Sequence, residues 1–118
     1  MKHIIIAALY LLILFCLSTF VFDPSYLYYE LPWLDIPMHI LGGFGVANLV
    51  GSILLYNKKH PSYKKLFMVY LCVAIAWEAY EYIHDMIKVL VWNGWPDTIG
   101  DLANGWIGMS IAYLFVRK

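Results

Sequence analysis

The sequence has few charged residues. Only 14% of its 118 residues are charged, and eight basic residues balance eight acidic ones, so the formal net charge is zero. Soluble domains average about 25% charged residues. No basic tract and no charged tail is present, so nucleic acid is not an expected partner. The rest is rich in apolar residues (63% hydrophobic, mean hydropathy +0.69), which indicates a membrane protein.

Cysteine is also scarce. Cys16 and Cys72 both lie in apolar runs, and we interpret them as small buried hydrophobic residues rather than as a disulfide or zinc pair. The N-terminal apolar run extends to Phe22 without an A-x-A cleavage site, and it is longer than the core of about 7–15 residues in a signal peptide. Phe15 is too bulky to precede a lipoprotein processing site. We therefore expect a retained first helix.

Four apolar runs are long enough to cross a bilayer, at about 4–22, 36–56, 66–91 and 98–116. Each approaches or exceeds the roughly 20 residues that a helix needs to span the hydrocarbon core. Backbone polar groups find no water there, so runs of this length must be helical. The sequence predicts an all-α fold, with one transmembrane domain over 1–118 that forms a four-helix bundle.

The basic residues predict the orientation. All except Lys88 fall on one side of the predicted bundle: Lys2, Lys58, Lys59, Lys64, Lys65, Arg117 and Lys118. By the positive-inside rule this side is cytoplasmic, and so are both termini. All eight acids lie in the opposite half or beyond it. We expect a multi-pass protein of the cell (inner) membrane, surrounded by membrane lipids, with its polar site facing the non-cytoplasmic side.

The third span carries an acidic stripe. At about 100° per residue, Glu78, Glu81 and Asp85 fall on one face of a helix. An acid at the centre of a membrane helix costs about 2.5–3.5 kcal/mol on the insertion scale. Lys88, the one basic residue nearby, cannot neutralise several acids. They must therefore be protonated, hydrated or bound to a cation.

Two further polar pairs begin the second and fourth spans. Asp35 and His39 are four residues apart, as are Asp97 and Asp101, and Asn104 continues the second of these stripes. Each aspartate at a helix start has an alternative interpretation as an N-cap. His39 has one as a hydrogen-bonding group between helices.

The sequence also predicts how the helices pack. Gly105, Gly108 and Ala112 form a predicted close-packing seam on the fourth helix. The first span has no acid or histidine, and we interpret it as scaffold.

Carboxylates with histidine suit Zn, Mn or Fe, and carboxylates alone suit Mg, so we predict a site for one of these divalent cations. The candidate ligands are His39, Glu78, Glu81 and Asp101. Residues that could orient them or replace them are Asp35, Asp85, Asp97 and Asn104. His39 or Glu78 would be the general base if the site is catalytic. A polar network that only holds the bundle together and a proton relay are the alternatives.

The same motifs resemble a known group. The segment LDIPMHILGG at 34–43, the Glu78-x-x-Glu81 pair, and Asp97-x-x-x-Asp101 with the glycines after it are similar to VanZ-like small membrane proteins. The similarity is closer to a related bacterial and archaeal family of predicted inner-membrane proteins of unknown function. It covers about Leu34 to Ala112. The resemblance implies that the polar residues of these motifs form the site: Asp35, His39, Glu78, Glu81, Asp97 and Asp101. For VanZ-like proteins it also implies an association with low-level glycopeptide resistance. It implies no reaction.

Three functions remain open from the sequence. The first is a metal-dependent enzyme acting on an outer-leaflet lipid or an envelope precursor. The second is a carrier of protons or cations, although Leu71 and Ala74 continue the Glu78 stripe inward without polar groups, so that a homo-oligomer would have to complete a path. The third is an accessory or resistance-type protein that binds a ligand without turnover.

Overall fold

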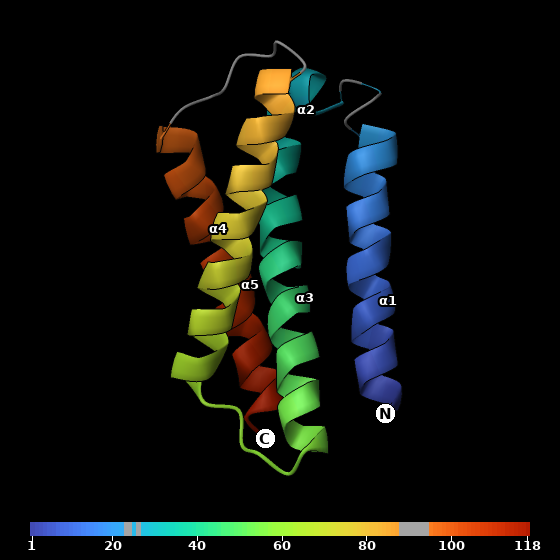
Figure 1. Ribbon diagram of the computed structural model, residues 1–118, viewed down its shortest axis with the longest axis vertical. Helices are drawn as coiled ribbons and strands as arrows, with labels where there is room; N and C mark the ends of the chain where they lie inside the picture. Colours follow the sequence, from blue (N-terminus) through green and yellow to red (C-terminus); the bar gives the residue numbers. More distant parts are fainter. Residues whose placement is uncertain (23–24, 26, 88–94) are drawn as a thin grey trace.

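The computed structural model describes residues 1–22, 25, 27–87 and 95–118 (Figure 1), and these residues form helices and no strand. In chain order the elements are α1 (Lys2–Cys16) with a π-helical continuation (Leu17–Phe22), the short α2 (Leu27–Glu30), a 3-10 turn (Pro32–Leu34), α3 (Asp35–Tyr56), α4 (Tyr63–Ile87) and α5 (Trp95–Val116). Four of these segments are long and apolar enough to cross a membrane. The predicted all-α, four-span membrane fold is therefore confirmed.

Two helices begin earlier than their apolar runs. Helix α4 starts at Tyr63, three residues before the predicted start, because the backbone N–H of Lys65 donates to the Ser62 hydroxyl at 3.3 Å, which caps a polar first turn. Helix α5 starts at Trp95. The predicted end of the third span at 91, and Lys88, lie outside the described residues.

The closest packing joins α3 to α5. A Cβ atom on Gly43 would collide with the backbone carbonyl of Gly105, and one on Gly108 would collide with the carbonyl of Ile40. The two backbones touch because these positions have no side chain, as in other membrane helix pairs with small residues at the contact. Of the predicted close-packing seam of the last helix, Gly108 faces α3, whereas a Cβ atom on Gly105 would meet the ring of Tyr70 in α4.

The remaining helices pack around this pair. The buried core lies between α3, α4 and α5 and consists of Ala47, Leu66, Tyr70, Met109, Ala112 and Val116. Helix α1 packs mainly against α3, where the Tyr10 hydroxyl donates to the carbonyl of Leu41 at 2.9 Å. Both termini and the basic α3–α4 connection lie at one end of the bundle, so the polar starts of α3 and α5 lie at the other (Figure 1).

Candidate functional site

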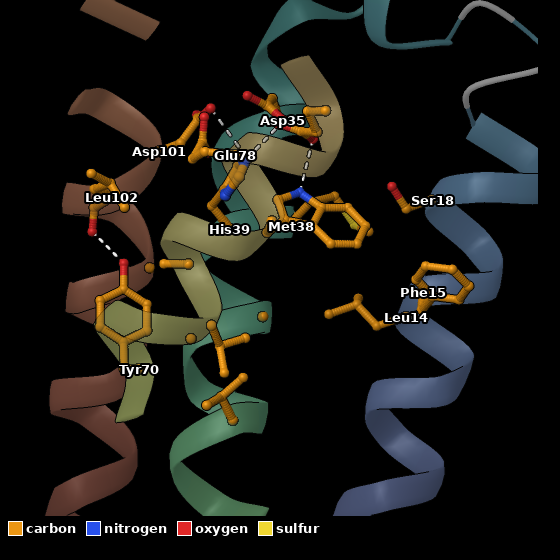
Figure 2. A pocket seen from close by; sticks show the side chains of 18 of the residues that line it. Leu14, Phe15, Ser18, Asp35, Met38, His39, Tyr70, Glu78, Asp101 and Leu102 are labelled. Atoms are coloured by element: carbon orange, nitrogen blue, oxygen red, sulfur yellow. Dashed lines mark hydrogen bonds and ion pairs between the residues drawn. The ribbon is translucent and has the colours of Figure 1, made fainter. Parts of the chain in front are cut away.

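His39 lies between two carboxylates. Its Nε2 atom is 3.2 Å from an oxygen of Asp35, one turn earlier in α3, and 3.4 Å from an oxygen of Asp101 in α5. Asp101 is only 5% exposed. The imidazole thus connects the two helices that pack most closely (Figure 2).

Helix α4 brings its acids to the same place. One potential ligand atom from each of four residues lies within 4.8 Å of the others, and we call this set the four-residue cluster: His39, Glu78, Glu81 and Asp101. Trp77, one turn before Glu81, donates its indole N–H to the Glu81 carboxylate at 2.8 Å. The structure therefore brings together, from three helices, the residues that the sequence offers as first ligands.

The other candidate residues divide into two groups. Asp35 and Asp97 form a second close set with Asp101, their oxygens also within 4.8 Å of one another. Asn104 is half-buried on α5 and does not line the cavity beside the four-residue cluster. Asp85 lies in α4, and its side chain is outside the described part of the structure.

Asp35 does not act as the expected cap of α3. Leu34 occupies the N-cap position of α3, and no side chain caps that helix. Asp35 is the first residue of α3 and its carboxylate faces His39 instead. Asp97 lies inside the first turn of α5, two residues after its start. Helix boundaries vary by a residue or two between criteria, but the Asp35–His39 contact does not depend on them.

The cluster forms one end of a cavity of about 160 Å³ between α1, α3, α4 and α5. Figure 2 shows Asp35, Glu78 and Asp101 at its upper end, with Leu14 and Phe15 of α1 across from α3. The wall away from the cluster is mainly apolar. None of the described residues that line the cavity is a lysine or an arginine, so His39 is the one lining side chain that can carry a positive charge.

The sequence did not indicate the contribution of α1. We expected scaffold, yet Leu14, Phe15 and Ser18 line the cavity. Trp77 was also missed, although its position four residues before Glu81 is a signal, because such pairs meet on a helix face. The side chains of α1 are ordinary for a membrane span, so no pattern in the sequence marks them.

The donor set fits a divalent cation. One imidazole and three carboxylates are the ligand types of Zn, Mn and Fe sites, and their convergence from separate helices is typical of metal sites in bundle cores. A purely structural network fits as well, because no buried side-chain nitrogen or oxygen among the described residues lacks a hydrogen-bond partner. Geometry alone leaves both interpretations, which a binding experiment separates.

Comparison with known proteins gives a family. The family model described as "Predicted membrane protein (DUF2238)" matches residues 3–118. No curated protein and no solved structure matches the chain. The similarity to VanZ-like proteins stays a prediction.

Proposed function

This chain belongs to the DUF2238 family of predicted membrane proteins, and we propose that it binds a divalent cation through the four-residue cluster, at the non-cytoplasmic end of the bundle. The observation that carries the proposal is the convergence of the cluster atoms within 4.8 Å from α3, α4 and α5. The cavity beside them gives a bound cation an open side toward a ligand. The basic α3–α4 connection at the opposite end supports the orientation.

Electrostatics favours a cation here. Two ionised carboxylates within 4.8 Å repel each other by about 3 kcal/mol or more at an effective dielectric of about 20, and the cluster contains three carboxylates. One imidazolium cannot compensate all of them. A divalent cation would turn these repulsions into attractions without requiring protons on the acids.

The ligand types narrow the choice of metal. Mg prefers oxygen ligands and retains several waters, whereas an imidazole nitrogen beside carboxylates suits Zn, Mn or Fe. We therefore place these three ahead of Mg. Such a cation would polarise an oxygen of a ligand or activate a bound water, which is the chemistry of a hydrolase acting on a lipid or envelope precursor. In a protein without turnover, the contact between the cation and an oxygen of the ligand would serve binding alone, as in an accessory or resistance-type protein.

A structural network is the second candidate. It is favoured by the mutual pairing of Asp35, His39 and Asp101, which satisfies all three without a metal. A carrier of protons or cations receives less support, because such a function needs a polar path across the bundle. The core between the cavity and the termini contains the apolar residues Leu66, Met109 and Ala112. The two leading candidates predict different results when a single acid is neutralised. A cation site loses its metal, whereas a structural network loses folding.

Metal content tests the proposal. The protein is purified in detergent without a metal-affinity step, dialysed against a series of Zn or Mn concentrations that spans half-saturation of the wild type, and measured by elemental mass spectrometry alongside Glu81→Gln and Asp101→Asn. We expect close to one metal per chain in the wild type and a loss of at least about tenfold in affinity for each variant, because a missing ligand weakens a site by that order. Glu30→Gln, an acid exposed outside the cluster, is the matched control and should keep the metal.

Folding is followed in the same samples by circular dichroism and gel filtration. Metal-free wild type after dialysis, or full metal content in both cluster variants, would contradict the cation site. Variants that unfold while the wild type binds no metal would support the structural network. Glu81→Gln remains informative if Asp101→Asn fails to fold, because Glu81 is not part of the Asp35–His39–Asp101 pairing.

A further inference from the structure

The cavity extends beyond the four-residue cluster, and this further part has an apolar wall. Away from the acids its walls are formed by side chains such as Leu11, Leu14, Met38, Val46 and Val73. An apolar cavity of about 150 Å³ accepts a benzene ring. The whole cavity, with its polar end included, measures about 160 Å³, so its apolar part has room for fewer than about six carbon atoms. A cation and its water ligands would occupy the polar end and leave the apolar part to a short hydrocarbon segment.

Gly42 shows independently that the space is open. A Cβ atom built on this residue would meet no atom within 4 Å, although Gly42 lies in the middle of α3 and lines the cavity. The neighbouring glycines of the same helix have no such space beside them. A Cβ on Gly43 would strike the backbone of α5, and one on Gly45 would lie 2.6 Å from side-chain atoms of Leu11 and Tyr10. Close packing therefore explains those two glycines, but it does not explain Gly42.

On α1 and on α4, residues that line the cavity are also exposed at the surface of the bundle. Phe15 of α1 and Val73 of α4 both line the cavity, and they are 41% and 45% exposed. Helix α1 packs mainly against α3, and its described ring contact with α4 is an edge-to-face pair of Phe15 and Trp77, with centroids 6.0 Å apart. In a membrane the seam between α1 and α4 faces acyl chains, because it lies within two of the predicted spans.

The direction of the cavity matches that of a lipid. Its polar end lies toward the first turns of α3 and α5, and its apolar part extends toward the termini (Figures 1 and 2). A phospholipid in the leaflet at that end has the same direction, with its head group outward and its chains inward. A chain entering through the seam would place its head group beside the cluster without turning over.

We propose that the cavity binds the first carbons of one acyl chain of a membrane phospholipid, which enters between α1 and α4 and brings its phosphate to the four-residue cluster. The chain segment is held by the apolar wall, and the rest of the chain stays in the bilayer. The head-group contact rests on the proposed function, because a phosphate would be repelled by three carboxylates without the bound cation. The chain-binding cavity does not depend on it.

Photolabelling tests the proposal. The full chain is placed in nanodiscs that contain phosphatidylethanolamine with a diazirine on the early carbons of one acyl chain, irradiated, and digested for tandem mass spectrometry. Label on the half-buried cavity residues Leu14 and Val46 is compared with label on Ile111, which is 42% exposed on α5 and reports surrounding lipid. We expect cavity labelling in the wild type.

Gly42→Leu places an apolar side chain on the cavity wall at a position where its Cβ atom meets no other atom within 4 Å. This variant should lower the ratio of cavity label to Ile111 label by about tenfold, as expected for displacing about two buried methylene groups. Gly100→Leu is the matched control. A Cβ on Gly100 also meets nothing within 4 Å, but this residue does not line the cavity, so its ratio should equal that of the wild type.

Metal content of the same samples separates this proposal from the previous one. Cavity label that is lost in Gly42→Leu supports chain binding, whether or not the wild type holds a metal. Metal-loaded wild type without label on Leu14 and Val46 overturns chain binding and leaves the cation site standing. Equal ratios in Gly42→Leu and Gly100→Leu also overturn it, because the label would then come from another place.

Discussion

At the scale of single residues, His39 has the strongest effect on the site. It is the one cavity-lining side chain in the described structure that can be cationic, and it contacts acids from two directions. If it is lost, Asp101 is left almost fully buried beside Asp35 with no opposite charge. Removal of one partner of a buried ion pair is far more harmful than removal of both, because the remaining charge has lost its water and its partner.

A double-mutant cycle measures this pairing. We expect His39→Gln to lower the free energy of unfolding by about 3 kcal/mol, and Asp101→Asn in the same background to recover about 1 kcal/mol or more. Stability is measured by titration with SDS in mixed micelles. His60→Gln, at an exposed loop position, controls for the loss of an imidazole as such and should change little. Strictly additive effects of the two cluster substitutions would show that His39 and Asp101 are not coupled.

At the scale of elements, the contact of α3 with α5 decides where the site residues meet. Gly43 and Gly108 allow the two backbones to touch, and this contact sets the separation of His39 from Asp101. The polar stripes of both helices were visible in the sequence, and so was the glycine seam of α5. The side of α3 that contacts α5 was not visible in the sequence. Gly42, Gly43 and Gly45 are close together in the chain, and residue type does not show that Gly43 is the one that meets α5.

Adjacent glycines of α3 should respond differently to the same change. Gly43→Ala forces α3 away from α5, because the new Cβ meets a backbone carbonyl that cannot rotate away, and we expect a loss of about 2 kcal/mol or more. Gly42→Ala enters open space and should be neutral or stabilising by up to about 1 kcal/mol. Thermal unfolding in detergent compares the two. Similar melting temperatures for both variants would mean that α3 and α5 are not in backbone contact at Gly43.

At the scale of the whole molecule, the ends of the bundle differ in charge. The termini and the basic connection of α3 to α4 share one end, and the cluster lies toward the other. The side of the membrane that each end faces follows from the positive-inside rule and stays a prediction. It matters for function, because it decides which leaflet can supply a lipid to the cavity.

Cysteine labelling of intact cells tests the orientation. In a background with Cys16 and Cys72 replaced by alanine, Glu30→Cys should react with a membrane-impermeant maleimide, and Lys59→Cys should react only after the cells are permeabilised. Both positions are exposed, so accessibility in the folded protein is matched. The reverse pattern would place the cluster at the cytoplasmic side and assign the cavity to the inner leaflet.

The sequence by itself determined the number of spans, their helical form and the faces that carry acids. The reason is that hydropathy and a period of 3.6 residues act along one chain segment at a time. It also offered the four residues that converge in the cluster, since acids at membrane depth are too costly to face lipid. Capping by Ser62, which starts α4 before its apolar run, is a local signal that hydropathy alone does not include.

Only the tertiary structure decided which helix faces meet. Helix rotation and separation depend on close packing at a few contacts, such as Gly43 against Gly105, and no periodicity encodes them. The same packing directs Asp35 to His39 rather than to a cap, and it leaves open space above Gly42. The cavity and the role of α1 in its wall exist because α1 packs mainly against α3 and leaves its seam with α4 only partly filled.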